Sequence, residues 1–212
     1  MVKEKTWVKI CGTTTLEDAM AAVQAGADAI GFIFTTSPRE VTRETASGIL
    51  NAMPDPVLTI GVVANEPPDY VKALLRLCPV RGLQFHGQEP PEEVLAFRHD
   101  VKFLIKTIRV KDEKSIDRIP DYKGVDAVLL DAYWPGRLGG TGKPFPRELA
   151  LKAKQHGIPI IVAGGLDPSN VRELVREVAP FGVDVVSGVE QSPGKKDNDL
   201  VRKFVQMAKN VV

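Results

Sequence analysis

Short apolar runs rich in β-branched residues alternate with helix-like segments along the whole chain. Runs of this kind predict strands, and strands that alternate with helices predict a parallel sheet that is buried on both faces. No long linker or low-complexity stretch interrupts the alternation, so we expect a single domain over residues 1–212. The eight expected strands are Trp7–Ile10, Ala29–Phe34, Leu58–Val63, Gly82–Phe85, Val101–Thr107, Ala127–Leu130, Ile158–Val162 and Asp184–Val186.

Capping residues and apolar spacing mark several of the intervening helices. Thr14 and Glu17 stand at capping-box spacing, and Gly26 fits the position just beyond a helix end. Asp167 precedes a proline, as expected for the cap of a new helix, and the last helix is expected to begin near Asp199. Apolar stripes at helical spacing are Val171, Leu174, Val175 and Val178 on one helix, and Leu200, Val201, Phe204, Val205 and Ala208 on the last.

A weak internal repeat accompanies this alternation. The segments Gly26–Ala29, Gly124–Ala127 and Gly182–Val185 share the pattern Gly-x-Asp-x, and each lies where a helix hands over to a strand. An open, doubly wound sheet would share the alternation of strands and helices. Eight repeats within 212 residues favour the closed alternative, a (β/α)8 TIM barrel with outer helices.

Composition and charge narrow the class of partner. The 28 Lys and Arg residues nearly balance the 27 Asp and Glu residues, so nothing points to nucleic acid or to an anionic membrane. No apolar run is long enough to cross a bilayer, and the first residues lack a secretory signal. Two cysteines are too few for a disulfide framework or a cysteine zinc site. We therefore expect a cytoplasmic protein; the sequence leaves open whether it is a monomer or a homodimer.

Two short turns near the end of the chain combine small residues in a pattern typical of phosphate binding. They span Val162–Pro168 and Val185–Glu190, and each follows an apolar run and precedes a helix-like segment. Small residues let backbone N–H groups approach an anion, and a helix N-terminus adds partial positive charge. Paired sites after the seventh and eighth strands are typical of phosphate-binding barrels. A small phosphorylated substrate is therefore expected.

The carboxyl ends of the strands carry the chemistry in a barrel of this kind. Cys11 ends the first strand, and its thiolate could act as a base or nucleophile if nearby positive charge lowers its pKa. Asp131 ends an apolar run, where a raised pKa would let its carboxyl group donate a proton. Alternatively, Cys11 is a core residue, and Asp131 caps a helix or orders a loop. Cys78 lies at an apolar helix end and is expected in the core.

Further groups near these strand ends are candidates for supporting roles. Arg39 offers a planar donor fork suited to a carboxylate, or is a solvated loop residue. The segment Gly139–Gly142 would form a flexible cover over the site, or an ordinary turn. Lys9 is expected to point into the barrel, where Asp184 could pair with it. His86 has no second histidine at metal-ligand spacing, so we expect no metal site.

Together, these motifs resemble the phosphoribosylanthranilate isomerase family of tryptophan biosynthesis, in order and across nearly the whole chain. One departure is that Phe145–Arg147 lacks the Asp-Trp pair common after this phenylalanine, and another is that Val63 stands where an aromatic residue is usual. The segments that carry the resemblance are Lys9–Gly12, Gly31–Phe34, Ser37–Arg39, Gln84–Gly87, Leu130–Asp131, Gly139–Gly142, Ala163–Leu166 and Ser187–Glu190.

The resemblance implies a (β/α)8 barrel without metal or organic cofactor that catalyses an Amadori rearrangement. It implies that protonated Asp131 opens the ribose ring and that the thiolate of Cys11 removes the C2 proton. This needs an environment that raises the pKa of the carboxyl group and lowers that of the thiol. Arg39 is the candidate for the anthranilate carboxylate. Phosphate is expected on the backbone N–H groups of Gly164, Gly165, Ser187 and Gly188.

Other functions remain open at this stage. A related histidine-pathway isomerase of aminoimidazole ribotides is expected to have an aspartate in place of Cys11. Indoleglycerol phosphate synthase is expected to have a set of reactive lysines and an N-terminal extension. A barrel that binds a phosphorylated metabolite without turnover could keep the same residues.

Overall fold

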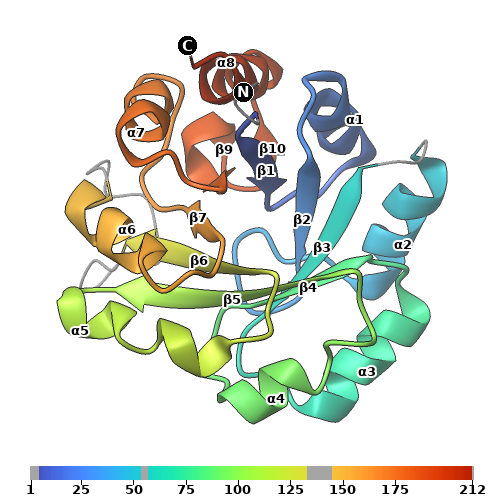
Figure 1. Ribbon diagram of the computed structural model, residues 1–212. Helices are drawn as coiled ribbons and strands as arrows, with labels where there is room; N and C mark the ends of the chain where they lie inside the picture. The colour runs from blue at the N-terminus through green and yellow to red at the C-terminus, as the bar shows by residue number, and fades with distance from the viewer. Residues whose placement is uncertain (1–4, 54–56, 133–144, 212) are drawn as a thin grey trace.

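Eight parallel strands close into one barrel, with β1 pairing with both β2 and β8 (Figure 1). The computed structural model describes residues 5–53, 57–132 and 145–211. This confirms the expected fold class. The barrel strands are β1 (Trp7–Cys11), β2 (Ala29–Ile33), β3 (Leu58–Val63), β4 (Gly82–Phe85), β5 (Phe103–Val110), β6 (Ala127–Ala132), β7 (Ile160–Val162) and β8 (Gly182–Val185).

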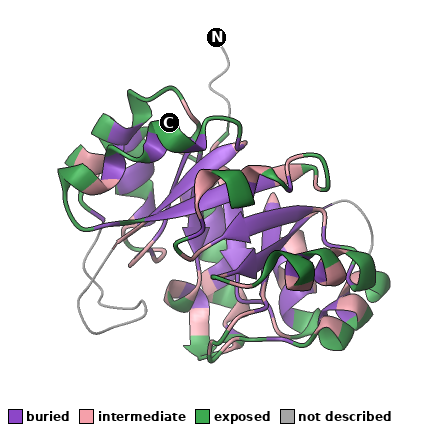
Figure 2. Ribbon diagram, turned by 90° about the horizontal axis from the view of Figure 1, so that it is seen from below, coloured by how far each residue is buried: buried purple, intermediate pink, exposed green. Residues whose placement is uncertain are grey.

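Helices surround the barrel and expose their outer faces, while the strands are almost wholly buried (Figures 1 and 2). The expected apolar stripe of the seventh helix is buried, and four of the five residues expected on the last helix are buried as well. The elements outside the strands are α1 (Leu16–Gln24), α2 (Arg43–Ala52), α3 (Pro68–Leu77), α4 (Pro91–Leu95), α5 (Glu113–Ile116), η1 (Ile119–Tyr122), α6 (Arg147–Lys154), α7 (Val171–Val178), η2 (Ser187–Val189) and α8 (Asn198–Lys209).

Two helix starts differ from expectation, and in both cases a side chain is used elsewhere. Thr15 caps α1 by accepting from the backbone N–H of Asp18, while Thr14 donates to the carbonyl of Gly194. Asp167 does not cap α7, because its carboxylate accepts from the backbone N–H and the hydroxyl of Ser169 and so orders the turn before the helix. Gly26 follows α1 with φ +86°, as expected of a glycine beyond a helix end.

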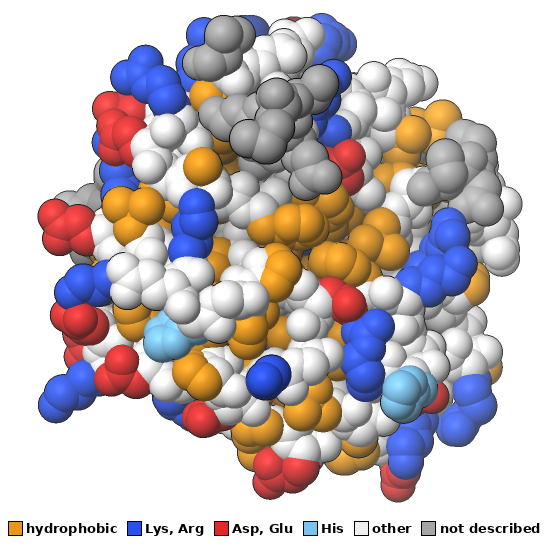
Figure 3. Space-filling view, in the orientation of Figure 1, with side chains coloured by type: hydrophobic (Ala, Val, Ile, Leu, Met, Phe, Trp, Pro, Cys, Tyr) orange, Lys and Arg blue, Asp and Glu red, His pale blue; other side chains and the backbone are white. Residues whose placement is uncertain are grey.

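The amino-terminal ends of the strands form a closed floor. Trp7, Phe103 and Phe181 stack with ring centroids 5.7–6.3 Å apart. Asp28 and Asp126 each accept a backbone N–H from a neighbouring strand, at Val8 and Leu104 respectively. Hydrophobic side chains also gather near the centre of the face seen in Figure 3. Contacts at this end stabilise the barrel and leave the opposite end for chemistry.

Inside the barrel an apolar cluster gives way to buried polar groups. Ile60, Ile105, Leu129 and Ile161 belong to the apolar cluster, which Cys11 joins. Lys9, Gln84, Thr107 and Asp184 are also buried. Buried polar groups are costly unless they are paired, so their concentration points to a site. In the described part of the chain, no helix is long and apolar enough to cross a membrane.

Candidate active site

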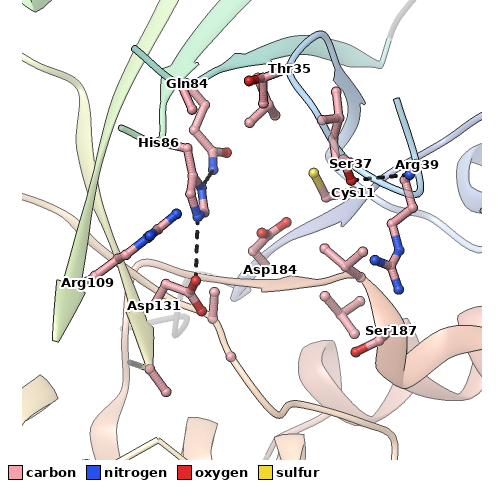
Figure 4. A pocket seen from close by; sticks show the side chains of 18 of the residues that line it. Cys11, Thr35, Ser37, Arg39, Gln84, His86, Arg109, Asp131, Asp184 and Ser187 are labelled. Atoms are coloured by element: carbon pink, nitrogen blue, oxygen red, sulfur yellow. Dashed lines mark hydrogen bonds and ion pairs between the residues drawn. The ribbon is translucent and has the colours of Figure 1, made fainter. Parts of the chain in front are cut away.

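A cavity of about 360 Å³ opens at the carboxyl ends of the strands (Figure 4). Its walls come from several strands and from the loops that follow them, as the barrel architecture requires. Cys11 and Asp131 line this one cavity, so they lie at the same end of the barrel. The expected site residues that line it are Cys11, Arg39, Asp131, Gly164, Gly165 and Ser187.

Cys11 lies at the end of β1 with 3% of its surface exposed, and its sulfur points into the cavity (Figure 4). The side chain of Lys9 lies two residues earlier on the same face of the strand, where its positive charge favours the thiolate form of Cys11. Lys9 Nζ donates to Asp184 Oδ1 at 3.0 Å. The expected pairing of Lys9 with Asp184 is therefore present, and it places a buried cation beside the thiol.

Burial and the neighbouring charges together shift the pKa of this thiol in the direction opposite to the expected one. Burial is the largest influence and raises the pKa of Cys11, because a thiolate loses hydration there. Lys9 opposes this by attraction, Asp184 adds to it by repulsion, and Lys196 opposes it. The resulting pKa is raised. The expectation of a lowered thiol pKa is therefore wrong for this site, because the sequence shows the cations but not the degree of burial.

Gly31 on β2 makes room for this arrangement. A Cβ atom at this position would lie 2.6 Å from Cys11 Sγ and 3.0 Å from Lys9 Cε. Both distances are tighter than van der Waals contact allows, and the atoms lie in the closed interior of the barrel. The missing side chain of Gly31 thus forms the space that the sulfur and the lysine occupy.

We predict that Gly31→Ala destabilises the protein by about 1–3 kcal/mol, because overpacking forces neighbouring side chains out of place. The shift in the urea midpoint measures this. Gly48→Ala is the matched control, since a Cβ on Gly48 in α2 meets nothing within 4 Å. It should stabilise by up to about 1 kcal/mol through helix propensity. Equal stability of the two variants would contradict the steric role of Gly31.

Asp131 faces the cavity from the end of β6 and lies next to His86. The distance from His86 Nε2 to Asp131 Oδ2 is 3.5 Å (Figure 4). Gln84 Nε2 lies 3.1 Å from His86 Nδ1 and also donates to Thr107 Oγ1. These contacts of Gln84 orient the imidazole ring of His86. The sequence analysis considered His86 only as a metal ligand. Its position two residues after the inward-facing Gln84 was the signal that it could share the cavity with Asp131.

The two small-residue turns meet at one side of the cavity. Gly164 and Gly165 both have positive φ values, +83° and +68°, which few other residues tolerate. Ser187 opens the 3-10 helix η2 and lines the cavity. Gly188 lies behind it rather than among the lining residues, and a Cβ there would be 1.9 Å from the carbonyl oxygen of Leu166. Gly188 therefore lets the two turns approach each other.

The second turn does not lead directly into a helix, in contrast to the expectation. After η2 comes a short hairpin of β9 (Glu190–Ser192) and β10 (Lys195–Lys196), and α8 follows it. The carboxylate of Glu190 accepts from Arg39 Nε at 2.9 Å and from Nη2 at 2.7 Å. Arg39 thus lies beside Ser187 on the far side of the cavity from Asp131 (Figure 4).

Two further expectations concern residues away from these walls. Cys78 is fully buried beyond the end of α3, as expected of a core residue. The glycine-rich segment Gly139–Gly142 lies outside the described residues. Within residues 5–53, 57–132 and 145–211, no group of three His, Cys, Asp or Glu side chains could hold a metal ion.

Comparison with known proteins places the chain in a family. Residues 8–207 match the model of N-(5'-phosphoribosyl)anthranilate (PRA) isomerase. The enzyme of that name from Geobacter sulfurreducens is 50% identical over 203 residues, which are 95% of this chain and 98% of the relative. The one from Rubrobacter xylanophilus is 46% identical over 96% of this chain and 98% of the relative.

Solved structures agree with the sequence relatives. The crystal structure of phosphoribosylanthranilate isomerase from Thermotoga maritima superimposes with a TM-score of 0.90 at 37% identity, covering 96% of this chain and 98% of that one. The corresponding enzyme from Thermus thermophilus gives a TM-score of 0.86 at 34% identity, covering 95% and 98%. The chain therefore belongs to the N-(5'-phosphoribosyl)anthranilate isomerase family.

Proposed function

We propose that this protein isomerises N-(5-phosphoribosyl)anthranilate to 1-(2-carboxyphenylamino)-1-deoxyribulose 5-phosphate in tryptophan biosynthesis, with Cys11 as the base and Asp131 as the acid. The observation that carries the assignment of residues is that both side chains line one cavity beside the two small-residue turns after β7 and β8. A sugar phosphate held on those turns reaches both groups at once. Positioned acid–base partners of this kind each contribute roughly 10²–10⁴-fold to the rate.

The proposed reaction begins with a proton from the carboxyl group of Asp131 to the ribose ring oxygen. The C1–O bond breaks, and the nitrogen lone pair forms the C1=N bond of an iminium ion. The thiolate of Cys11 then takes the proton from C2, and its bonding electrons form C1=C2 while the C=N electrons return to nitrogen. The resulting enolamine gains a proton at C1 and loses one from the C2 hydroxyl, which gives the ketone.

The phosphate group is proposed to bind where the β7 and β8 turns meet. Gly164, Gly165 and Ser187 line this part of the cavity, and Ser187 opens η2, whose first backbone N–H groups have no partner within the helix itself. We assign Gly188 to this cradle through its packing against the β7 turn. Binding energy from the phosphate helps to hold the reacting carbons between acid and base.

The anthranilate carboxylate is proposed to bind Arg39. Arg39 lines the cavity and belongs to the loop between β2 and α2. A guanidinium group is suited to a planar carboxylate. In one crystal structure, phosphoribosylanthranilate isomerase is in complex with reduced 1-(o-carboxyphenylamino)-1-deoxyribulose 5-phosphate, a molecule with both anionic groups. The Thermotoga maritima relative is described as dimeric.

Turnover is tested with freshly made phosphoribosylanthranilate, whose fluorescence changes as it is consumed. We expect conversion without added metal or cofactor, and competitive inhibition by inorganic phosphate at the β7–β8 turns. Saturable binding of the reduced product analogue without any turnover would instead support a non-catalytic barrel. Conversion of an aminoimidazole ribotide but not of the anthranilate would support the histidine-pathway alternative.

A further inference from the structure

The hairpin β9–β10 carries two buried charged side chains that the proposed reaction does not use. Glu190 and Lys196 have side chains that are 4% and 0% exposed, although both belong to a short polar segment after the barrel. Buried ion pairs stabilise a fold little more than apolar residues of the same size would. Their presence beside the cavity therefore calls for an explanation other than stability.

Lys196 has no donor left for a substrate. Its ammonium group donates to the carbonyl of Cys11 at 2.6 Å, to the carbonyl of Val186 at 3.1 Å and to Glu190 Oε1 at 3.1 Å. An ammonium group has three hydrogens, so these contacts use all of them. Lys196 thus ties the ends of β1 and β8 together and fixes Glu190 relative to both.

Glu190 is equally occupied. Its oxygens accept from Arg39 Nε and Nη2, from Lys196 and, at 3.3 Å, from the backbone N–H of Gly194. Of the Arg39 guanidinium nitrogens, Nη1 is the one for which the described part of the chain shows no hydrogen bond. The two cations, Arg39 and Lys196, and the carboxylate of Glu190 together leave a single net positive charge at this wall of the cavity.

The path of the Arg39 side chain is fixed as well. A Cβ atom on Gly12 would lie 3.1 Å from Arg39 Cδ and 3.2 Å from Val186 Cγ1, and Gly12 has φ +73°. The stem of the arginine therefore packs closely over the end of β1. An arginine on a loop normally loses much rotational freedom when it binds a ligand, and one that is already held loses less.

We propose that Glu190, held by Lys196, is a positioning residue that aims Arg39 at the carboxylate of the substrate and so sets the specificity for anthranilate. The inference rests on the proposed function, because it takes the carboxylate as the group that Arg39 binds. It assigns no contact between Glu190 and the substrate.

The test compares two ligands in equilibrium binding: the reduced product analogue and the same molecule without its carboxylate. For the wild-type protein we expect the carboxylate to improve affinity by about 10- to 100-fold, the worth of a charge-assisted hydrogen bond. Glu190→Gln removes the carboxylate that accepts from both Nε and Nη2 of Arg39, and we expect the preference for the ligand with the carboxylate to fall to about threefold or less. The affinity for the ligand without the carboxylate should stay within about threefold of wild type, a result that general damage to the site would not give.

The matched control is Glu177→Gln, which breaks the ion pair of Arg147 with Glu177 on the outer surface. It should keep the wild-type preference within about twofold. If Glu190→Gln does not fold, Glu190→Asp takes its place, because it keeps the charge beside Lys196 but is too short for the fork. Its preference should also fall to about threefold or less.

Either Glu190 variant, if folded and with an unchanged preference, overturns the inference while leaving the proposed function intact. A wild-type protein that binds both ligands equally contradicts the role of Arg39 and, with it, the inference. Catalysis by Cys11 and Asp131 is measured separately by turnover, so the two failures can be told apart.

Discussion

Replacing Cys11 by alanine should reduce kcat by at least about 10²-fold, with an upper range near 10⁴-fold, because the proposed base for the C2 proton is lost. Affinity for the reduced product analogue should stay within about tenfold, since the phosphate turns and Arg39 are untouched. The fluorescence assay gives kcat, and titration gives the affinity. A variant that keeps more than a few per cent of wild-type kcat would falsify the assignment of Cys11.

Cys78→Ala is the control for this result. Cys78 is buried at the end of α3 and does not line the cavity, so its loss should cost stability and leave kcat within about twofold.

The pH dependence follows from the direction of the thiol pKa. The role proposed for Cys11 requires the thiolate, which forms as the pH rises through the pKa of Cys11. Because burial raises that pKa, we expect kcat/KM of the wild-type protein to increase with pH on a limb above the usual thiol range.

Asp131→Asn should lower kcat by about 10²–10⁴-fold, because the amide keeps the shape of the side chain but cannot protonate the ring oxygen. The contact between His86 and the side chain at position 131 can persist, so the cavity should stay intact. Single-turnover kinetics with the fluorescent substrate separate slow ring opening from weak binding. Full activity of this variant would show that another group supplies the proton.

Asp126→Asn is the control at the other end of the same strand. Asp126 accepts from the backbone N–H of Leu104 at the floor of the barrel and pairs with Arg98. We expect a loss of about 1–3 kcal/mol in the free energy of unfolding and kcat within about twofold, because the floor supports stability rather than chemistry. A large loss of kcat in Asp126→Asn, with wild-type kcat in Asp131→Asn, would contradict the proposal that the chemistry takes place at the carboxyl ends of the strands.

The sequence was sufficient for the barrel and for most of its cavity. Strand runs such as Leu58–Val63 and Gly82–Phe85 are observed with the expected bounds, because apolar β-branched runs between turns are a strong local signal. Cys11, Arg39 and Asp131 line one cavity because the carboxyl ends of parallel strands, and the loops that follow them, meet at one end of a barrel.

The features that were missed depend on contacts between distant parts of the chain. Lys196 stands between Lys195 and Asp197, a context typical of a solvated turn, yet its partners include a carbonyl 185 residues away. The ion pair of Glu190 with Arg39 joins residues that lie 151 positions apart in the sequence. The direction of the Cys11 pKa likewise depends on burial, which no local pattern of residues measures.

The contact between Lys196 and the backbone of Cys11 joins the last βα unit to the first. A growing polypeptide contains Cys11 within its first dozen residues, but Lys196, which holds the end of that strand, comes only with the hairpin of β9 and β10. The end of β1 therefore gains its contact with Lys196 only when β10 has been synthesised. A fragment truncated before β10 would lack this tie even though every group proposed to touch the sugar phosphate is present.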